Sequence, residues 1–271
     1  MMAPMNMTGR MAVAALTMVL AACDPHRGGA LAGKATSEWT HSYALDPGGE
    51  FQIVGASGSI DVRGTANPAI EVKAERIVHA ASNALAESMV SKVRITEDVA
   101  PGKVVVRSEG LSGITVGVDI EVNFHATVPT GTKLRLHANN GDITVANIDG
   151  AIVVSSTNGA IAGTALRGGL DVRSTNGTVS LDLATVSKDP IDVRATNGTI
   201  DVTLPRTANA NIEANFTNGT LDLGDLPLQL TGEQTKRRTR GRLNDGGAPI
   251  DLTVLNGNIR IRATGTPISA P

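Results

Sequence analysis

From residue 131 onward, the chain is a succession of short runs in which apolar and polar residues alternate. A representative unit is LDVRSTNGTVSLDL, residues 170–183, in which one alternating run stands on each side of an Asn-Gly dipeptide. Alternation with period two places successive side chains on opposite faces of a β-strand. Each unit is therefore predicted to be a strand, an Asn-Gly corner, a second strand and a loop, with Val, Ile and Leu facing a core.

The Asn-Gly unit recurs along the chain with a nearly constant step. Its asparagines are Asn140, Asn158, Asn176, Asn197, Asn218 and Asn256. Two folds share this period. In an antiparallel meander, each Asn-Gly is a hairpin turn, because both residues tolerate a positive φ. In a β-solenoid, successive units stack, Val154 lies over Val172, Val172 lies over Val193, and the asparagines form a ladder at one structural corner. The constant coil length favours the solenoid.

The organisation predicted for the rest of the chain is less regular. Residues 46–130 form an N-terminal β portion that contains one helix near residues 82–93, with Ser82 as its N-cap. Because a solenoid exposes strand edges at its ends, this helix is expected to be a cap. The repeat solenoid itself covers residues 131–263, and a C-terminal tail of residues 264–271 follows.

Two motifs relate the chain to a known family. They are the repeated Thr-Asn-Gly-Thr-(Ile/Val/Leu)-x-(Val/Leu) units and the earlier Gly-Ser-Ile-Asp-Val-Arg-Gly of residues 58–64. They resemble the bacterial β-strand-repeat family of putative adhesins over roughly residues 45–263. The resemblance implies an all-β, right-handed β-helix-like solenoid in an envelope protein, and it supplies no catalytic residues. The chain departs from simple repetition at residues 229–249, which replace one corner.

The first residues are predicted to be a targeting signal. Residues 1–22 contain one basic residue, Arg10, followed by a short apolar run that is too short to span a bilayer. The run ends Leu-Ala-Ala-Cys23, which resembles the bacterial lipobox. That resemblance implies an exported lipoprotein, cleaved before Cys23 and acylated there. Residues 23–45 are then a flexible tether. Asp24 favours the inner membrane, although the choice between inner and outer membrane stays open.

Composition narrows the functional classes. The chain carries 24 Lys plus Arg against 26 Asp plus Glu, a net charge of −2, so it lacks the basic excess of a general nucleic-acid binder. Cys23 is the only cysteine, which rules out an internal disulfide. The five histidines are too dispersed for a zinc motif, and no nucleophile elbow occurs. We therefore expect no catalytic residues, no metal site and no cofactor.

One segment stands out by its charge. Its basic residues are Lys236, Arg237, Arg238, Arg240 and Arg242. Because this segment replaces a regular corner, it is expected to loop out of the stack, either as a solvated loop or as a patch for an anionic envelope polymer.

These features together predict a non-enzymatic envelope lipoprotein. It would be held to the membrane by its N-terminal lipid, and its solenoid surface would bind envelope polymers or another envelope protein. The alternative is a sensory or scaffolding component of envelope stress signalling. The third hypothesis is a β-helix enzyme that acts on polysaccharide. The sequence does not specify the oligomeric state.

The lipobox makes the first testable prediction. Cys23→Ser removes the thiol that would receive the diacylglycerol, so the variant is expected to incorporate no palmitate analogue during growth, whereas the parent is labelled. Equal labelling of the two proteins would contradict lipidation at this residue.

Overall fold

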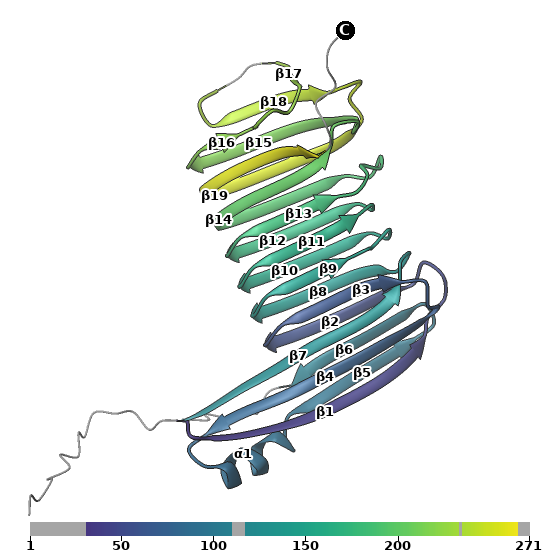
Figure 1. Cartoon of the computed structure of the whole chain (residues 1–271), viewed down its shortest axis with the longest axis vertical. Coiled ribbons are helices and arrows are strands. Elements are labelled where there is room, and N and C mark those ends of the chain that lie inside the picture. The colour runs from purple at the N-terminus through teal and green to yellow at the C-terminus, as the bar shows by residue number, and fades with distance from the viewer. Residues whose placement is uncertain (1–30, 110–116, 233–234, 265–271) are drawn as a thin grey trace, which may run out of the picture. The chain divides into compact units, whose positions relative to one another are not determined.

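The computed structural model describes residues 31–109, 117–232 and 235–264, and it shows a β-solenoid (Figure 1). Strand β12 (Leu170–Asn176) pairs in parallel with β10 (Ile152–Asn158) on one side and with β14 (Ile191–Pro205) on the other. Val154 lies beside Val172, and Val172 lies beside Val193, as the solenoid predicts. The antiparallel meander is therefore wrong.

The solenoid has two faces, which meet at the Asn-Gly corner. Face A contains the strands that precede the corner in each coil. In spatial order its members are β5 (Arg94–Ala100), β6 (Lys103–Glu109), β2 (Glu50–Ser57), β8 (Lys133–Asn140), β10, β12, the first half of β14, the first half of β19 (Ala248–Thr264), β15 (Ala210–Asn218), β18 (Arg238–Leu243) and β17 (Leu228–Leu230). The pairs β5–β6, β15–β18 and β17–β18 are antiparallel, and the others are parallel.

Face B contains the strands that follow the corner. In spatial order its members are β1 (Gly33–Ala44), β4 (Ala69–Ala80), β7 (Val118–Pro129), β3 (Ile60–Thr65), β9 (Ile143–Ala146), β11 (Ile161–Leu166), β13 (Val179–Leu183), the second halves of β14 and β19, and β16 (Leu221–Asp222). The pairs β1–β4 and β4–β7 are antiparallel, and the others are parallel.

The core lies between the two faces and follows the predicted alternation. Inward Val172, Val193 and Ile200 are buried, whereas their outward neighbours Arg173 and Arg194 are exposed. Such a core consists mainly of β-branched and Leu side chains, which suit the narrow space between two sheets.

Two ladders build the Asn-Gly corner. The asparagine amides form a hydrogen-bonded row in which each Nδ2 donates to the Oδ1 of the neighbouring coil at 2.8–3.0 Å. The row runs Asn218, Asn256, Asn197, Asn176, Asn158 and Asn140. The glycines form the second ladder. Gly177 has φ +147°, and a Cβ placed on it would overlap the carbonyl oxygen of Gly159 in the next coil. Only glycine therefore permits the coils to approach this closely.

The coils do not stack in chain order at either end. The last coil, β19, lies between β14 and the coil formed by β15 and β16. At the other end, the coil formed by β2 and β3 lies between that of β6 and β7 and that of β8 and β9. The terminal segments of the solenoid are thus inserted between coils that are internal to the sequence.

The predicted helix is present at the N-terminal end. Helix α1 (Asn83–Val90) is N-capped by Ser82, whose hydroxyl accepts a hydrogen bond from the Leu85 amide at 3.3 Å. Its buried residues are Ala86 and Val90, and it packs against β1 and β4. It therefore covers part of the solenoid end, as the sequence predicts (Figure 1).

A polar and aromatic cluster joins the two edge strands at the same end. The Tyr43 hydroxyl on β1 donates to Glu97 Oε2 on β5 at 2.8 Å, and His41 Nδ1 lies 3.3 Å from the same oxygen. The Tyr43 ring stacks on that of His41. Burial, and secondly the Glu97 hydrogen bond, raise the pKa of Tyr43 well above its usual range, so the phenol remains a donor.

Two predictions on the N-terminal region need correction. Residues 33–44, placed in a tether, form β1, which pairs with β4 along its whole length because it continues face B. Residues 50–65, placed in an irregular portion, form a regular coil whose strands pair in parallel on both sides. Cys23 and residues 264–271, apart from Thr264, lie outside the described residues.

The corner geometry predicts which glycines tolerate a side chain. Gly177→Ala is expected to lower stability by at least about 2 kcal/mol, because the new Cβ meets the backbone of Gly159 at a positive φ. Thermal unfolding of the variant should shift downward by about 5 °C or more. Gly131 is the matched control, since a Cβ there meets nothing within 4 Å. Equal shifts for Gly177→Ala and Gly131→Ala would contradict the close-packed corner.

Candidate functional site

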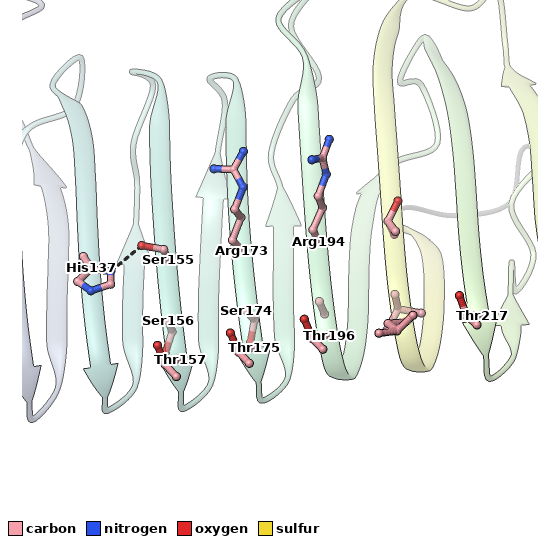
Figure 2. A pocket seen from close by; sticks show the side chains of 14 residues that line it. His137, Ser155, Ser156, Thr157, Arg173, Ser174, Thr175, Arg194, Thr196 and Thr217 are labelled. Carbon is pink, nitrogen blue, oxygen red and sulfur yellow. Dashed lines mark hydrogen bonds between the residues drawn. The ribbon is translucent and has the colours of Figure 1, made fainter.

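A shallow groove of about 440 Å³ runs across face A, beside the Asn-Gly corner. It crosses β8, β10, β12, β14, β19 and β15, so its long direction follows the solenoid axis. Figure 2 shows the side chains that line it. Neighbouring coils are spaced about 4.8 Å apart, which repeats the same outward positions at that interval along the groove.

A row of threonines forms one side of the groove. Thr157, Thr175, Thr196 and Thr217 lie at the same level on their strands, directly before the asparagine ladder (Figure 2). Their hydroxyls have no hydrogen-bond partner among the residues that the structure describes. These groups are therefore available as donors and acceptors for a ligand.

Two arginines form the other side. Arg173 and Arg194 are paired neighbours on β12 and β14, and both side chains extend away from the threonine row (Figure 2). Each is held by an aspartate two residues earlier on its own strand, since Arg173 Nη1 lies 3.0 Å from Asp171 and Arg194 Nη2 lies 2.6 Å from Asp192. The pairs fix the guanidinium groups and neutralise their charge. The remaining N–H groups can donate to a ligand.

The groove also has an apolar contact and a partly unsatisfied lining. Leu255 of β19 takes the place of a threonine in the row, and its side chain is 47% exposed. Ser156 and Ser174 are 3% and 4% exposed, because they lie on the inward side of their strands with Val154 and Val172, so their hydroxyls are not accessible to a ligand. Within the described structure, neither hydroxyl oxygen has a hydrogen-bond partner. Leu255 is therefore the apolar contact that the groove offers to a ligand.

One serine–histidine pair lies at the β8 end of the groove. His137 Nδ1 is 2.8 Å from Ser155 Oγ (Figure 2). Among the described residues, no carboxylate is bonded to the other nitrogen of His137 to orient the ring, as a triad requires. The surrounding backbone amides are committed to the parallel ladder, so they cannot form an oxyanion hole. The arrangement suits hydrogen bonding to a ligand and not nucleophilic catalysis.

Acidic residues form a row beside the groove. Asp171, Asp192, Asp251 and Glu213 are register neighbours on consecutive strands of face A. Asp251 makes no ion pair within the part of the chain that the structure describes. Its pKa is raised, first by partial burial and then by the charges of Glu213 and Asp192.

The predicted basic patch is placed differently from expectation. Arg238, Arg240 and Arg242 do not loop out of the stack, because residues 238–243 form strand β18, which pairs with β15 and closes face A. Arg238 and Arg240 bind Glu213, with nearest atoms at 2.6 and 2.8 Å. Arg242 donates to Gln229 at 3.0 Å. Lys236 and Arg237 lie in the exposed turn before the strand. The anion-binding role of the patch stays a prediction.

Other site types have little support. No group of three or more His, Cys, Asp or Glu side chains within the described ranges could hold a metal ion. The helix within those ranges, α1, is too short to cross a membrane.

The groove was not predicted from the sequence, although part of its signal was present. Aligning the repeats by their Asn-Gly dipeptides places Ser155, Arg173 and Arg194 in one outward column and the threonines in another. That alignment does not show that Leu255 lies between Thr196 and Thr217, because this neighbourhood depends on the insertion of β19.

This architecture defines a β-solenoid repeat protein. The chain belongs to the Toastrack family DUF4097, which matches residues 48–262. No curated protein matches the chain.

Solved structures with a similar fold have low sequence identity to the chain. A putative cell adhesion protein from Clostridium sporogenes is 14% identical, with a TM-score of 0.50, and the match covers 84% of this chain and 100% of that one. A putative adhesin from Bacteroides fragilis is 11% identical, with a TM-score of 0.40, and the match covers 84% of this chain and 97% of that one. At such low identity, the similarity to the Clostridium protein supports the fold alone.

The acidic row makes a pH-dependent prediction. Because the folded-state pKa of Asp251 is raised, the unfolded chain binds fewer protons at this residue, and the stability of the parent falls as pH rises from the usual pKa of about 3.9 through the raised value. Asp251→Asn removes the charge and is expected to raise the melting temperature at pH 7. At a pH below the usual value, parent and variant should melt together. Asp182→Asn on β13 is the control. If both variants raise the melting temperature at pH 7 by the same amount, the result argues against repulsion in the row.

Proposed function

We propose that the chain is an exported envelope lipoprotein, anchored through acylated Cys23, whose solenoid binds another envelope component through the groove on face A. The observation that carries the proposal is the groove itself, in which unpartnered hydroxyls, two fixed guanidinium groups and the exposed Leu255 converge across six strands. A site with several polar groups and an apolar contact is the usual form of a recognition surface.

The groove is a better binding site than the basic segment. Three of the five basic residues in that segment are bonded to neighbours, since Arg238 and Arg240 bind Glu213 and Arg242 binds Gln229. These three arginines belong to strand β18 at the end of face A, and their bonds to Glu213 and Gln229 use much of the positive charge of the segment. The threonine hydroxyls of the groove, in contrast, make no hydrogen bond within the described chain.

A binding role without catalysis also agrees with the Clostridium protein of similar fold. That protein is described as a putative cell adhesion protein. The groove offers side chains that hold a ligand, and its Ser155–His137 pair lacks the orienting carboxylate and oxyanion donors of a hydrolase. We therefore propose adhesion or envelope binding, and no enzymatic activity.

The proposal is tested by binding to cell envelopes. Residues 23–271 carrying Cys23→Ser, which lack the lipid, are expected to co-sediment with purified envelopes of the producing bacterium. Thr175→Asp adds a charge to the threonine row and should weaken this binding by about tenfold or more. Thr144→Asp is the matched control, because Thr144 is also an exposed strand threonine but lies on face B.

Two results would overturn the proposed site or the proposed function. Equal weakening by Thr175→Asp and Thr144→Asp would remove the groove as the binding site. An unlipidated parent that does not sediment with envelopes at all would remove the binding function.

A further inference from the structure

We infer that the groove on face A takes an uncharged, linear, polyhydroxylated chain, that is, a neutral glycan, lying along the solenoid axis. The inference rests on the proposed function, because it names the class of ligand for the same site. It follows from the charge, the hydrogen-bonding groups and the repeat spacing of the groove.

Charge is the first argument. The cations at the centre of the groove, Arg173 and Arg194, are each paired with an aspartate of the same strand. The acidic row continues on the neighbouring strands through Asp251 and Glu213. A polyanion in the groove would have to compete with these carboxylates for the guanidinium groups, and it would also meet the carboxylate of Asp251, which makes no ion pair within the described residues. A neutral ligand meets neither obstacle.

Hydrogen bonding is the second argument. The central strands of face A are paired on both sides, so their backbone groups are committed and a peptide cannot add to them as an extra strand. Recognition must therefore use side chains. Hydroxyls that can both donate and accept, together with guanidinium N–H groups, match the hydroxyls of a sugar, which also do both.

The shape of the lining is the third argument. Leu255, 47% exposed, lies between the Thr196 and Thr217 positions and provides an apolar contact for the C–H face of a sugar ring. Along the groove, the threonine position recurs on β10, β12, β14 and β15, while β8 carries Asn139 there and β19 carries Leu255. A linear polymer aligned with the axis meets the same hydroxyl repeatedly, at about 4.8 Å intervals, and many weak contacts can then add to a useful affinity.

The experiment measures binding of the unlipidated chain to immobilised polysaccharides at low and high salt. The neutral probes are dextran, amylose, mannan and cello-oligosaccharides, and the acidic probe is polygalacturonate. We expect at least one neutral probe to bind, with an affinity that salt does not change, because no net charge is neutralised. Thr175→Val, which removes one hydroxyl and keeps its shape, should weaken this binding by about 2- to 10-fold. Thr144→Val on face B should leave it unchanged.

Other outcomes overturn the inference and separate it from the proposed function. Binding to polygalacturonate alone, reduced by salt, would make the groove an anion site. Envelope binding that is lost after protease treatment of the envelopes, with no glycan bound, would make the partner a protein and leave the proposed function standing. Loss of both envelope and glycan binding in the parent would remove both proposals.

Discussion

The close approach of successive coils at the Asn-Gly corner is the constraint on which the rest of the structure depends. A carbonyl oxygen of one coil occupies the space that a Cβ would need in the next, as at Gly159 and Gly177. Glycine at the described Asn-Gly corners therefore permits the parallel ladder to continue around them, while the asparagine amides satisfy one another across the same spacing. With the corner set, period-two alternation decides which side chains enter the core and which face solvent.

The parallel hydrogen-bond ladder also leaves exposed strand edges at the two ends of the solenoid. A stack of parallel strands leaves unpaired backbone groups at both ends, and such edges invite fraying and association. The chain meets this partly by antiparallel closing strands, β5 and β1 at one end and β18 with β17 at the other. It also inserts its outlying coils between internal ones, so that β19 is paired on both sides. A terminal segment held in this way cannot peel off without breaking two ladders.

Stacking also gives the surface its chemical character. A residue repeated once per coil becomes a column with a spacing of about 4.8 Å, so a modest sequence preference produces a continuous strip. The threonine column, the acidic row and the paired arginines of face A all arise in this way. Like charges in one column repel, and Asp171 and Asp192 are offset by their pairs with Arg173 and Arg194. Asp251 has no such partner two residues later, and its pKa is raised first by partial burial and then by the charges of Glu213 and Asp192. Leu255 is then an exposed apolar residue in a strip whose neighbouring positions, Thr196 and Thr217, are polar.

The sequence by itself determined the class of fold, the faces of the repeat strands, the Asn-Gly corner and the N-cap at Ser82, because each depends on local periodicity or on the conformational range of single residues. It did not determine that residues 33–44 form a strand, that the basic segment contains β18, or that β19 lies between β14 and β15. These depend on long-range pairing, in which one strand edge accepts any compatible partner. The same distinction holds for the groove. Its columns of side chains follow from the sequence repeat, but the neighbours of Leu255 depend on the tertiary position of the last coil in the stack.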